Sequence, residues 1–464
     1  MNAKPYPKYK ASGVEWLGDV PEHWEVKRGR FSVRVNPPSE ILRKLPAETE
    51  VSFVPMEAVG VDGGLKLDQE KPISEVGAGY TEFQEQDIVV AKITPCFENG
   101  KAAIAQGLTN QAAYGTTELH VLRSRKDMEH RFLFYVVLSD TFRKLGEAEM
   151  YGAGGQKRVP PEFCKDFRIS LPPRPEQKAI ADFLDDRTAK LDGFLEKKRA
   201  LIGKLKEKRS ALISRTVTKG LPPEAAAKAG LTPNPKLKPS GIPWLGDIPV
   251  DWTCTKVWIH RVSGNLELQD GNHGEIHPKA EDYRDDGIPF IMANHIVSGQ
   301  IDFTRCNFIE EDQAESLRIG FSKAGDVLLT HKGTIGKVGI VQESKYPYVM
   351  LTPQVTYYRC KRALLNRFLR WQFESRFWFD QLKLVGGLGS TRAYIGLLHQ
   401  KTLSLILPTS DEQLAISDYL DIEASKIDRM IQKVETAIEK LTEYRTSLIT
   451  AAVTGKISVQ NIRR

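Results

Sequence analysis

The sequence contains no apolar run that could cross a membrane. Its longest run of hydrophobic residues, Phe132 to Leu138, reads FLFYVVL. A helix that spans a bilayer needs about 20 such residues. The opening segment MNAKPYPKYK also lacks the apolar core of a secretory signal. We therefore expect a cytoplasmic protein with no membrane association.

Cysteine is scarce and scattered along the chain. The five cysteines are Cys96, Cys164, Cys254, Cys306 and Cys360. Their odd number and wide spacing argue against a disulfide framework and fit a reducing compartment. No Cys-x-x-Cys pair is present, which argues against a structural zinc site built on cysteines.

A strong excess of either charge is also missing. The 464 residues include 66 Lys and Arg against 59 Asp and Glu, which gives a formal net charge of +7. This modest excess fits a polyanionic partner and equally an ordinary solvated basic surface. Hydrophobic residues make up 41% and charged residues 27%, so the bulk of the chain is not disordered. The length predicts roughly two to four domains.

The sequence does contain an internal repeat. The segment Ser12 to Pro21 reads SGVEWLGDVP, and the segment Ser240 to Pro249 reads SGIPWLGDIP. Trp24 and Trp252 follow the two copies in register. Such a match predicts two halves of similar structure. We expect the tryptophans of both copies to pack between a globular domain and a helix rather than to stack on bases.

Two further matches lie downstream of the tryptophan segments. The strand-like segment DIVVA at 87–91 matches DVLLT at 326–330, and each is followed by a Gly-Lys turn. The segment LPPRPEQ at 171–177 matches LPTSDEQ at 407–413. The offset between the copies changes along the chain, so insertions and deletions lie between the matched elements. The two halves are therefore built alike but diverge in the middle.

A long helix is predicted after each Glu-Gln pair. Proline and glycine are absent from Glu412 to Thr454, and hydrophobic residues recur there in two stripes with a period of seven residues, as in a coiled coil. The first half shows the same stripes. Lys198, Arg209 and Arg445 interrupt them. Each helix has about 40 residues and a length of roughly 60 Å. The residues that we expect to pair the helices are Leu184, Leu191, Leu195, Ile202, Leu205, Leu212, Leu420, Ile427, Ile431, Val434, Ile438, Leu441 and Leu448.

The two predicted helices are expected to pair antiparallel. In a parallel pair, the connection 220–239 would have to return the full ~60 Å, which is about the limit for an extended segment of ~20 residues. That connection is rich in proline and alanine. An antiparallel pair needs no such extension and predicts one globular region at each end of a rod. The alternative is that each helix packs onto its own domain.

Two motifs resemble catalytic or metal sites without their full pattern. Residues 36–39 read Asn-Pro-Pro-Ser, similar to the Asn-Pro-Pro-aromatic loop of amino-methyltransferases, but serine takes the aromatic position and no glycine-rich cofactor loop accompanies it. His273 and His277 could share a helical face, but a structural zinc ion needs four ligands. We expect neither a methyltransferase site nor a metal site here.

A third motif has the residue types of a magnesium-dependent nuclease. Asp326, Glu343 and Lys345 could supply two carboxylates and a lysine. However, the equivalent Asp87 of the first half has no matching Glu-x-Lys. The basic segment 332–337 lacks the glycine spacing of a phosphate-binding P-loop. The sequence therefore predicts no catalytic residues.

Basic, glycine-containing loops occupy matching places in the two halves. Glycine lets the backbone approach a phosphate closely, and Lys, Arg and Gln can bind phosphates or base edges. For any single residue, an ordinary solvated side chain is about as plausible as a DNA contact. Recurrence in both halves favours contact. The candidate DNA-binding residues are Lys92, Lys101, Gln156, Lys157 and Arg158 in the first half, and Lys332, Lys337, Thr391 and Arg392 in the second.

These segments together resemble a known protein family. The Trp-Leu-Gly-Asp segments, the stretch AKITPCFENGK at 91–101 and the Leu-Pro-x-x-x-Glu-Gln entry to a long helix are similar to those of the DNA specificity subunit of type I restriction-modification systems. The resemblance spans essentially the whole chain. In the second half, residues 331–334 read HKGT, a departure from the Lys-Ile-Thr-Pro form.

The resemblance implies an α+β fold. It would contain two similar globular target recognition domains in inverted orientation, separated by two long antiparallel coiled-coil helices. We assign the recognition domains to residues 1–174 and 240–410, and the linker to residues 220–239. The first conserved spacer helix would be 175–219, and the second, with the C-terminal tail, 411–464.

The resemblance also implies partners and cofactors. The chain would bind double-stranded DNA at an asymmetric bipartite target, two methyltransferase (M) subunits and restriction/translocase (R) subunits. S-adenosylmethionine, Mg²⁺ and ATP would bind to those partners, and this chain would hold no cofactor. Two alternatives remain open. One is a stand-alone DNA methyltransferase or nuclease, and the other is a coiled-coil scaffold without DNA binding.

Overall fold

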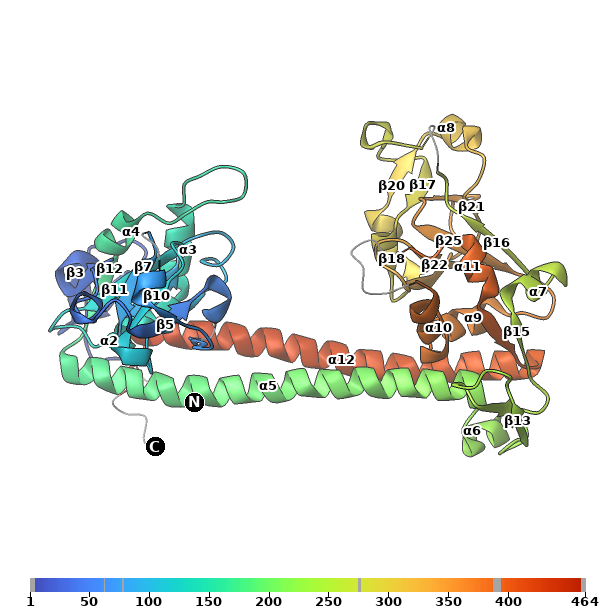
Figure 1. Ribbon diagram of the computed structural model, residues 1–464, viewed down its shortest axis with the longest axis horizontal. Helices are drawn as coiled ribbons and strands as arrows, with labels where there is room; N and C mark the ends of the chain where they lie inside the picture. Colours follow the sequence, from blue (N-terminus) through green and yellow to red (C-terminus); the bar gives the residue numbers. More distant parts are fainter. Residues whose placement is uncertain (1–4, 62, 77–78, 274–276, 387–393, 460–464) are drawn as a thin grey trace. The chain divides into compact units, whose positions relative to one another are not determined.

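The chain forms two compact units, described here from a computed structural model (Figure 1). Unit 1 comprises residues 1–199 and 436–464, and unit 2 comprises residues 200–435. Each unit contains a globular domain of mixed strands and helices, which confirms the α+β class. The residues that the structure describes are 5–61, 63–76, 79–273, 277–386 and 394–459.

The globular domain of unit 1 contains two four-stranded sheets. The first has the order β4-β11-β8-β9 and is antiparallel throughout. The second has the order β6-β5-β10-β7, in which β5 and β10 are parallel. Their bounds are β4 (Val33–Val35), β5 (Glu50–Val54), β6 (Glu70–Pro72), β7 (Thr81–Gln84), β8 (Ile88–Ala91), β9 (Ala102–Ile104), β10 (Ala112–Gly115) and β11 (Leu119–Ser124). The strand predicted at 87–91 is β8, a fully buried strand.

Short helices lie beside the first sheet, and two-stranded ribbons accompany both sheets. The helices are α1 (Gly29–Ser32), α2 (His130–Leu138), α3 (Asp140–Ala148) and α4 (Pro161–Asp166), and the ribbons pair β1 (Tyr9–Ala11) with β2 (Asp19–Pro21) and β3 (Glu25–Arg28) with β12 (Arg168–Leu171). The apolar run of the sequence is α2, and Phe132 to Leu138 are all buried. Ser139 begins α3 because its hydroxyl accepts a hydrogen bond from Phe142 N.

Unit 2 repeats this plan with a larger sheet. Its six-stranded sheet has the order β16-β25-β22-β23-β19-β18, and its four-stranded sheet has the order β20-β17-β24-β21. Their bounds are β16 (Leu266–Asp270), β17 (Ile288–Ile291), β18 (Ile296–Val297), β19 (Gly299–Ile301), β20 (Asn307–Ile309), β21 (Phe321–Ser322), β22 (Val327–Thr330), β23 (Val338–Ile340), β24 (Val349–Leu351) and β25 (Val355–Cys360). The predicted counterpart of β8 is the buried strand β22.

The remaining elements of unit 2 are short helices and two-stranded ribbons. The helices are α6 (Pro223–Lys228), α7 (Val257–Val262), α8 (Glu311–Ser316), α9 (Asn366–Phe373), α10 (Arg376–Gly386) and α11 (Leu397–Thr402). The ribbons pair β13 (Leu237–Pro239) with β14 (Asp247–Pro249) and β15 (Thr253–Lys256) with β26 (Ser404–Leu407). Trp252 is fully buried in the main core of unit 2, as Trp24 is in that of unit 1. Trp244, in contrast, is 47% exposed.

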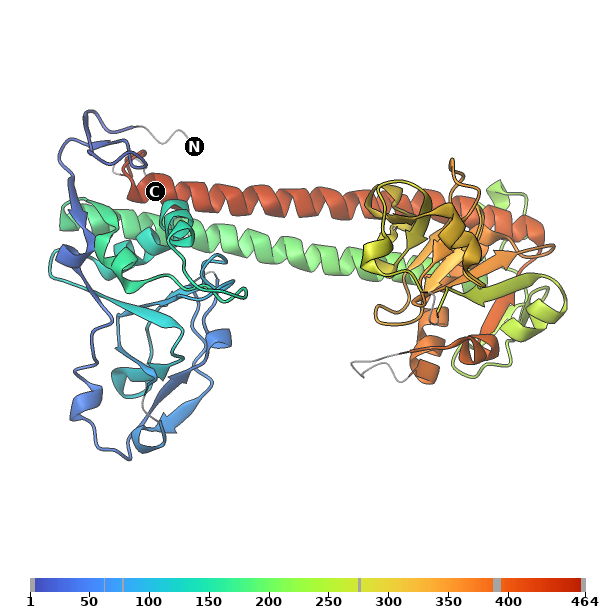
Figure 2. The same cartoon turned by 90° about the horizontal axis from the view of Figure 1, so that it is seen from above.

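Two long helices run through both units, as the heptads predict. These are α5 (Arg174–Lys219, 46 residues) and α12 (Ser410–Val453, 44 residues). In unit 1, Ile180 and Leu184 near the start of α5 share a core with Ile449 and Ala452 near the end of α12. In unit 2 the order is reversed, because the end of α5 shares a core with the start of α12. The helix segments within each unit are therefore antiparallel (Figure 2).

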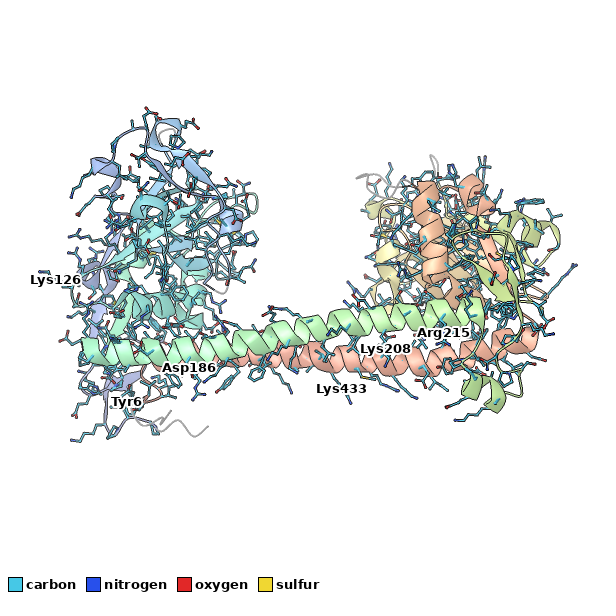
Figure 3. All side chains as sticks on the ribbon, turned by 60° about the horizontal axis from the view of Figure 1, so that its bottom comes forward. Tyr6, Lys126, Asp186, Lys208, Arg215 and Lys433 are labelled. Atoms are coloured by element: carbon cyan, nitrogen blue, oxygen red, sulfur yellow. The ribbon has the colours of Figure 1, made fainter. Side chains whose placement is uncertain are left out.

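The apolar stripes of the two helices are shielded from solvent, and their pairing residue by residue stays a prediction. All thirteen residues expected to pair the helices are buried or half-buried. Each domain also packs on the start of its own helix and on the end of the other, so the two arrangements considered from sequence coexist. Charged side chains such as Lys208 and Arg215 on α5 and Lys433 on α12 are exposed (Figure 3). The rod with one domain at each end stays a prediction.

Within the described residues, no helix combines the length and the apolar character that crossing a bilayer requires.

Candidate nucleic-acid interface

The predicted basic turn of unit 1 begins where β8 ends. Lys92 follows the last residue of β8, and its backbone is fixed from two sides. Its N–H donates to Glu118 O at 2.9 Å, and its carbonyl accepts from Val159 N at 2.8 Å. The Lys92 side chain is half-buried. The turn is thus held rigidly between β11 and the segment that precedes α4.

The same turn is built in unit 2 with the same hydrogen bonds. His331 occupies the place of Lys92, because its N–H donates to Gln354 O at 2.9 Å and its carbonyl accepts from Ile395 N at 3.0 Å. Lys332 is exposed and pairs across a β-bridge with Tyr394. The repeat therefore extends to main-chain contacts that no single sequence motif reveals.

Lys101 and Lys337 have an internal contact in both units. Lys101 Nζ donates to Met56 O at 3.0 Å, and Lys337 Nζ donates to Ala293 O at 3.2 Å. Both side chains are half-buried. Each ammonium group therefore holds its turn against a neighbouring 3₁₀ helix. An ammonium group has three protons, so a phosphate contact by these lysines stays a prediction.

The predicted flexible loop of unit 1 presents Gln156 and Lys157 to solvent. Both side chains are exposed. The backbone of Lys157 is tied to the turn, since Thr94 Oγ1 accepts from Lys157 N and donates to Lys157 O, each at 3.0 Å. Gly154 and Gly155 adopt φ values of 65° and 76°, which glycine adopts without strain. The Lys157 ammonium group is therefore projected from a fixed backbone position.

Arg158 has a different role from its neighbour Lys157. Its guanidinium group binds Glu118 through Nε and Nη2, the latter at 2.7 Å from Oε1. This contact lowers the pKa of Glu118 below its ordinary value. Arg158 therefore links the loop to the start of β11, and its role in DNA binding stays a prediction. In unit 2, Thr391 and Arg392 lie outside the described residues.

The Asn-Pro-Pro-Ser segment forms a structural junction rather than an open loop. Asn36 Oδ1 accepts from Val121 N at 2.9 Å, and Asn36 Nδ2 lies 3.2 Å from His120 Nδ1. His120 Nε2 lies 2.9 Å from Val159 O, so it carries the proton and donates. Burial lowers the pKa of His120. The Asn36 side chain is thus already used to join β4, β11 and the basic turn.

The nuclease-like residues are not assembled into a site. The Asp326 carboxylate accepts from Arg359 Nε at 2.9 Å and from Arg359 Nη2 at 2.7 Å. Exposed Lys345 lies 3.4 Å from Asp286 instead. In unit 1, Asp87 forms the equivalent pair with Arg123, with hydrogen bonds of 2.7 and 2.8 Å. Both aspartates therefore fix a buried strand.

No cluster of metal ligands is found in the described part of the chain. There, no three His, Cys, Asp or Glu side chains gather closely enough to hold an ion. His277 Nδ1 lies 3.1 Å from Asn272 O. Burial raises the pKa of Cys254 to about 11 and that of Cys306 to about 12, so neither thiol is activated as a nucleophile.

Comparison with known proteins finds a family model that matches part of the chain. Residues 74–202, which include β8, the basic turn and the loop of Lys157, match the family model described as "Type I restriction modification DNA specificity domain". This part of the chain is therefore similar to a type I DNA specificity domain. This agrees with the resemblance of its sequence motifs.

The chain is also similar to proteins named as specificity subunits. The chain is 39% identical over 179 residues to the type I restriction enzyme EcoEI specificity subunit and 41% identical over 180 residues to the EcoAI specificity subunit, both of Escherichia coli. Each match covers 38% of this chain and 30% of the relative. The MjaVIII specificity subunit of Methanocaldococcus jannaschii is 24% identical over 96% of this chain and 95% of its own length. The predicted non-catalytic role agrees with these names.

The fold also agrees with a solved protein. A chain from a study of complex assembly and conformational transition of the type I R-M system aligns over 94% of this chain and 99% of its own, with a TM-score of 0.64 and 16% identity. At this identity the likeness supports the fold. The likeness in fold thus extends over 94% of the chain and includes parts of both units.

Proposed function

We propose that this chain is the sequence-reading subunit of a type I restriction-modification complex. Each unit contributes one reader, and the two readers recognise the two halves of an asymmetric, bipartite DNA target. The observation that carries this proposal is the basic turn built twice on the same main-chain hydrogen bonds, with different side chains at equivalent positions.

The differences between the two turns support an asymmetric target. Unit 1 presents Lys92 where unit 2 has buried His331, and it presents Arg158 where unit 2 has Tyr394. Base edges are distinguished by the hydrogen-bonding groups that face them. Two readers with the same main-chain hydrogen bonds and different side chains would recognise different DNA sequences. The length of the spacer between the two half-sites would be set by the distance between the two readers.

The partners and cofactors follow from the same proposal. Two methyltransferase subunits and the restriction/translocase subunits would bind to this chain in the cytoplasm. S-adenosylmethionine, Mg²⁺ and ATP would bind to those partners. The residues of this chain that resemble catalytic groups, Asn36 and Asp326, already hold internal hydrogen bonds. This supports a reading role over the alternative of a stand-alone methyltransferase or nuclease.

A domain exchange tests the proposal directly. Residues 1–170 are replaced by the same region of a homologue with a known target, and the methylated sequence is determined in cells that express the partner subunits. One half of the recognised site should change, and the other half should stay the same. A change in both halves, or in neither, would contradict two independent readers.

The two alternatives have their own tests. Turnover by the purified chain alone, with DNA, Mg²⁺ and labelled S-adenosylmethionine, would favour an enzyme. Failure of the reconstituted complex to bind DNA at any salt concentration would favour a coiled-coil scaffold. Under the proposal, log affinity falls linearly with log salt concentration because bound phosphates release counterions.

A further inference from the structure

A small cavity of unit 1 lies between the basic turn and the long helices. It has a volume of about 170 Å³. Asn99 and Gly100 line it from the turn, Arg143 from α3, Arg199 from α5, and Arg445 and Thr446 from α12. We call it the arginine cavity. Among the described residues, no carboxylate lines it.

The guanidinium of Arg143 is poorly paired within the chain. Its Nε atom is buried and has no hydrogen-bond partner among the described residues. Among the described residues, its nearest carboxylate is that of Asp140, 3.9 Å from Nη2. The side chain packs against Gly100, where an added Cβ would lie 3.3 Å from Nη1. A buried donor without an acceptor is costly, so this position favours a ligand with acceptor oxygens.

The other two arginines add to the positive charge beside the cavity. Arg445 binds Asp192 through Nε and Nη2, so its Nη1 atom takes no part in that pair. Arg199 forms no ion pair with any described residue and is exposed. Three arginines therefore line one cavity. Among the described residues, Asp192 binds Arg445, Asp140 reaches Arg143 only at 3.9 Å, and neither carboxylate lines the cavity.

At the equivalent place in unit 2, carboxylates balance the positive charge. At the offset of 236 residues that relates this part of the two halves, Phe379 replaces Arg143 and Glu435 replaces Arg199. Phe379 packs on Gly336 as Arg143 packs on Gly100. Arg209, the counterpart of Arg445, lies between two carboxylates, 3.0 Å from Glu374 and 2.8 Å from Asp428. The excess of cations is therefore specific to unit 1 and is not required by the fold.

We propose that the arginine cavity binds a phosphate group, and that in the DNA complex this group belongs to the DNA backbone. Arginine forks match phosphate oxygens in geometry and charge. The cavity adjoins the turn that carries Lys92 and Lys101, so a bound phosphate would place the backbone beside the reader. The second part of the proposal rests on the proposed function. The first part does not.

Inorganic phosphate tests the cavity without DNA. The full chain is titrated with phosphate and followed by ³¹P NMR, together with Arg143→Gln, Arg199→Gln and the control Lys197→Gln. Lys197 is an exposed cation on the same helix as Arg199. We expect saturable binding that weakens at least tenfold in the two arginine variants and stays within twofold in the control. Absence of saturable binding, or equal weakening in all three variants, would overturn the proposal.

Two further measurements exclude trivial explanations. Thermal unfolding of Arg143→Gln should match that of the unaltered chain, so that weaker binding does not reflect misfolding.

Asp62, adjacent in sequence to Val61 of the cavity lining, lies outside the described residues. Phosphate affinity should stay within twofold in Asp62→Asn. A rise of more than tenfold would mean that an internal carboxylate fills the cavity, and this would overturn the proposal.

DNA binding by the reconstituted complex decides the source of the phosphate. Arg143→Gln should lower the slope of log affinity against log salt concentration by about one, the change expected for one lost phosphate contact. An unchanged slope with impaired phosphate binding would overturn the DNA assignment and leave a site for a free phosphate. If the unaltered complex bound no DNA at all, the proposed function would fail, while the phosphate titration would still decide on the cavity.

Discussion

Arg445 of α12 forms an ion pair with Asp192 of α5, with 2.9 Å between Nε and Oδ1. Arg209 and Asp428 form the same pair in unit 2, with the roles of the two helices exchanged. Both arginines are among the residues that interrupt the heptad stripes. These two interruptions therefore each have a partner on the other helix. Polar pairs between helices favour one register of pairing.

Removing Arg445 should destabilise unit 1. We expect Arg445→Ala to cost about 2 kcal/mol, less than the roughly 3–5 kcal/mol of a fully buried pair, because Asp192 keeps 35% of its side-chain surface exposed. The control Lys440→Ala, on the exposed face of α12, should change stability by less than about 0.5 kcal/mol. Hydrogen exchange of the last turns of α12 measures the difference. Equal protection in both variants would contradict this role.

Gln177 should be essential for joining α5 to its domain. Its Oε1 accepts from Glu129 N at 2.8 Å, and its Nε2 donates to Asp127 O and Pro172 O, each at 2.9 Å. Gln177→Ala leaves these buried groups unpaired and should cost about 3 kcal/mol. Gln413 makes the same contacts in unit 2.

Hydrogen exchange measured along the chain distinguishes the effects of the two glutamine variants. Gln177→Ala should deprotect the start of α2 and of α5, with unit 2 unchanged. Gln413→Ala should act on α9 and α12, with unit 1 unchanged. The opposite pattern, or deprotection of both units by either variant, would show that these contacts do not act locally.

Two lysines of the candidate interface should differ in behaviour. Lys157 is exposed, so Lys157→Ala should weaken DNA binding and lower the salt slope by about one, with partner binding and stability unchanged. Lys101 holds Met56 O, so Lys101→Ala should also lower stability, by about 1 kcal/mol. DNA titration at several salt concentrations and thermal unfolding measure both effects. Equal loss of DNA and partner binding in Lys157→Ala would contradict its assignment. The same DNA effect is expected for Arg392→Ala.

The stability of unit 1 should depend on His120 below neutral pH. Burial lowers the pKa of this imidazole, and its Nδ1 faces Asn36 Nδ2. Below the ordinary pKa of about 6.5, the unfolded chain binds a proton that the folded chain resists, so stability falls as pH falls. Urea unfolding midpoints at pH 7.5 and 5.5 should differ less for His120→Gln than for the unaltered chain. Identical differences would exclude this coupling.

The helices and the repeat could be predicted because their signals are local and periodic. The heptads and the absence of proline and glycine predict α12, and the copies of Trp-Leu-Gly-Asp predict the two halves. Gly193 and Gly203 did not prevent the prediction of α5, and both lie at positions where an added Cβ would meet nothing within 4 Å.

The roles of single cations could not be predicted in the same way. Arg158 binds Glu118, which lies 40 residues away, and Lys101 binds a backbone carbonyl that carries no sequence signal. One type of ion pair could have been predicted from the sequence. Arg123 and Arg359 recur at equivalent strand positions, as do Asp87 and Asp326, and recurrence of both charges indicates a structural ion pair.

Methylome sequencing of the host, with and without this gene, tests the central claim most directly. The account predicts a methylated motif of two specified half-sites with an unspecified spacer, lost when the gene is deleted and restored by its return. A methylome that stays the same after deletion, in cells that express the partner subunits, would contradict a reading role for this chain.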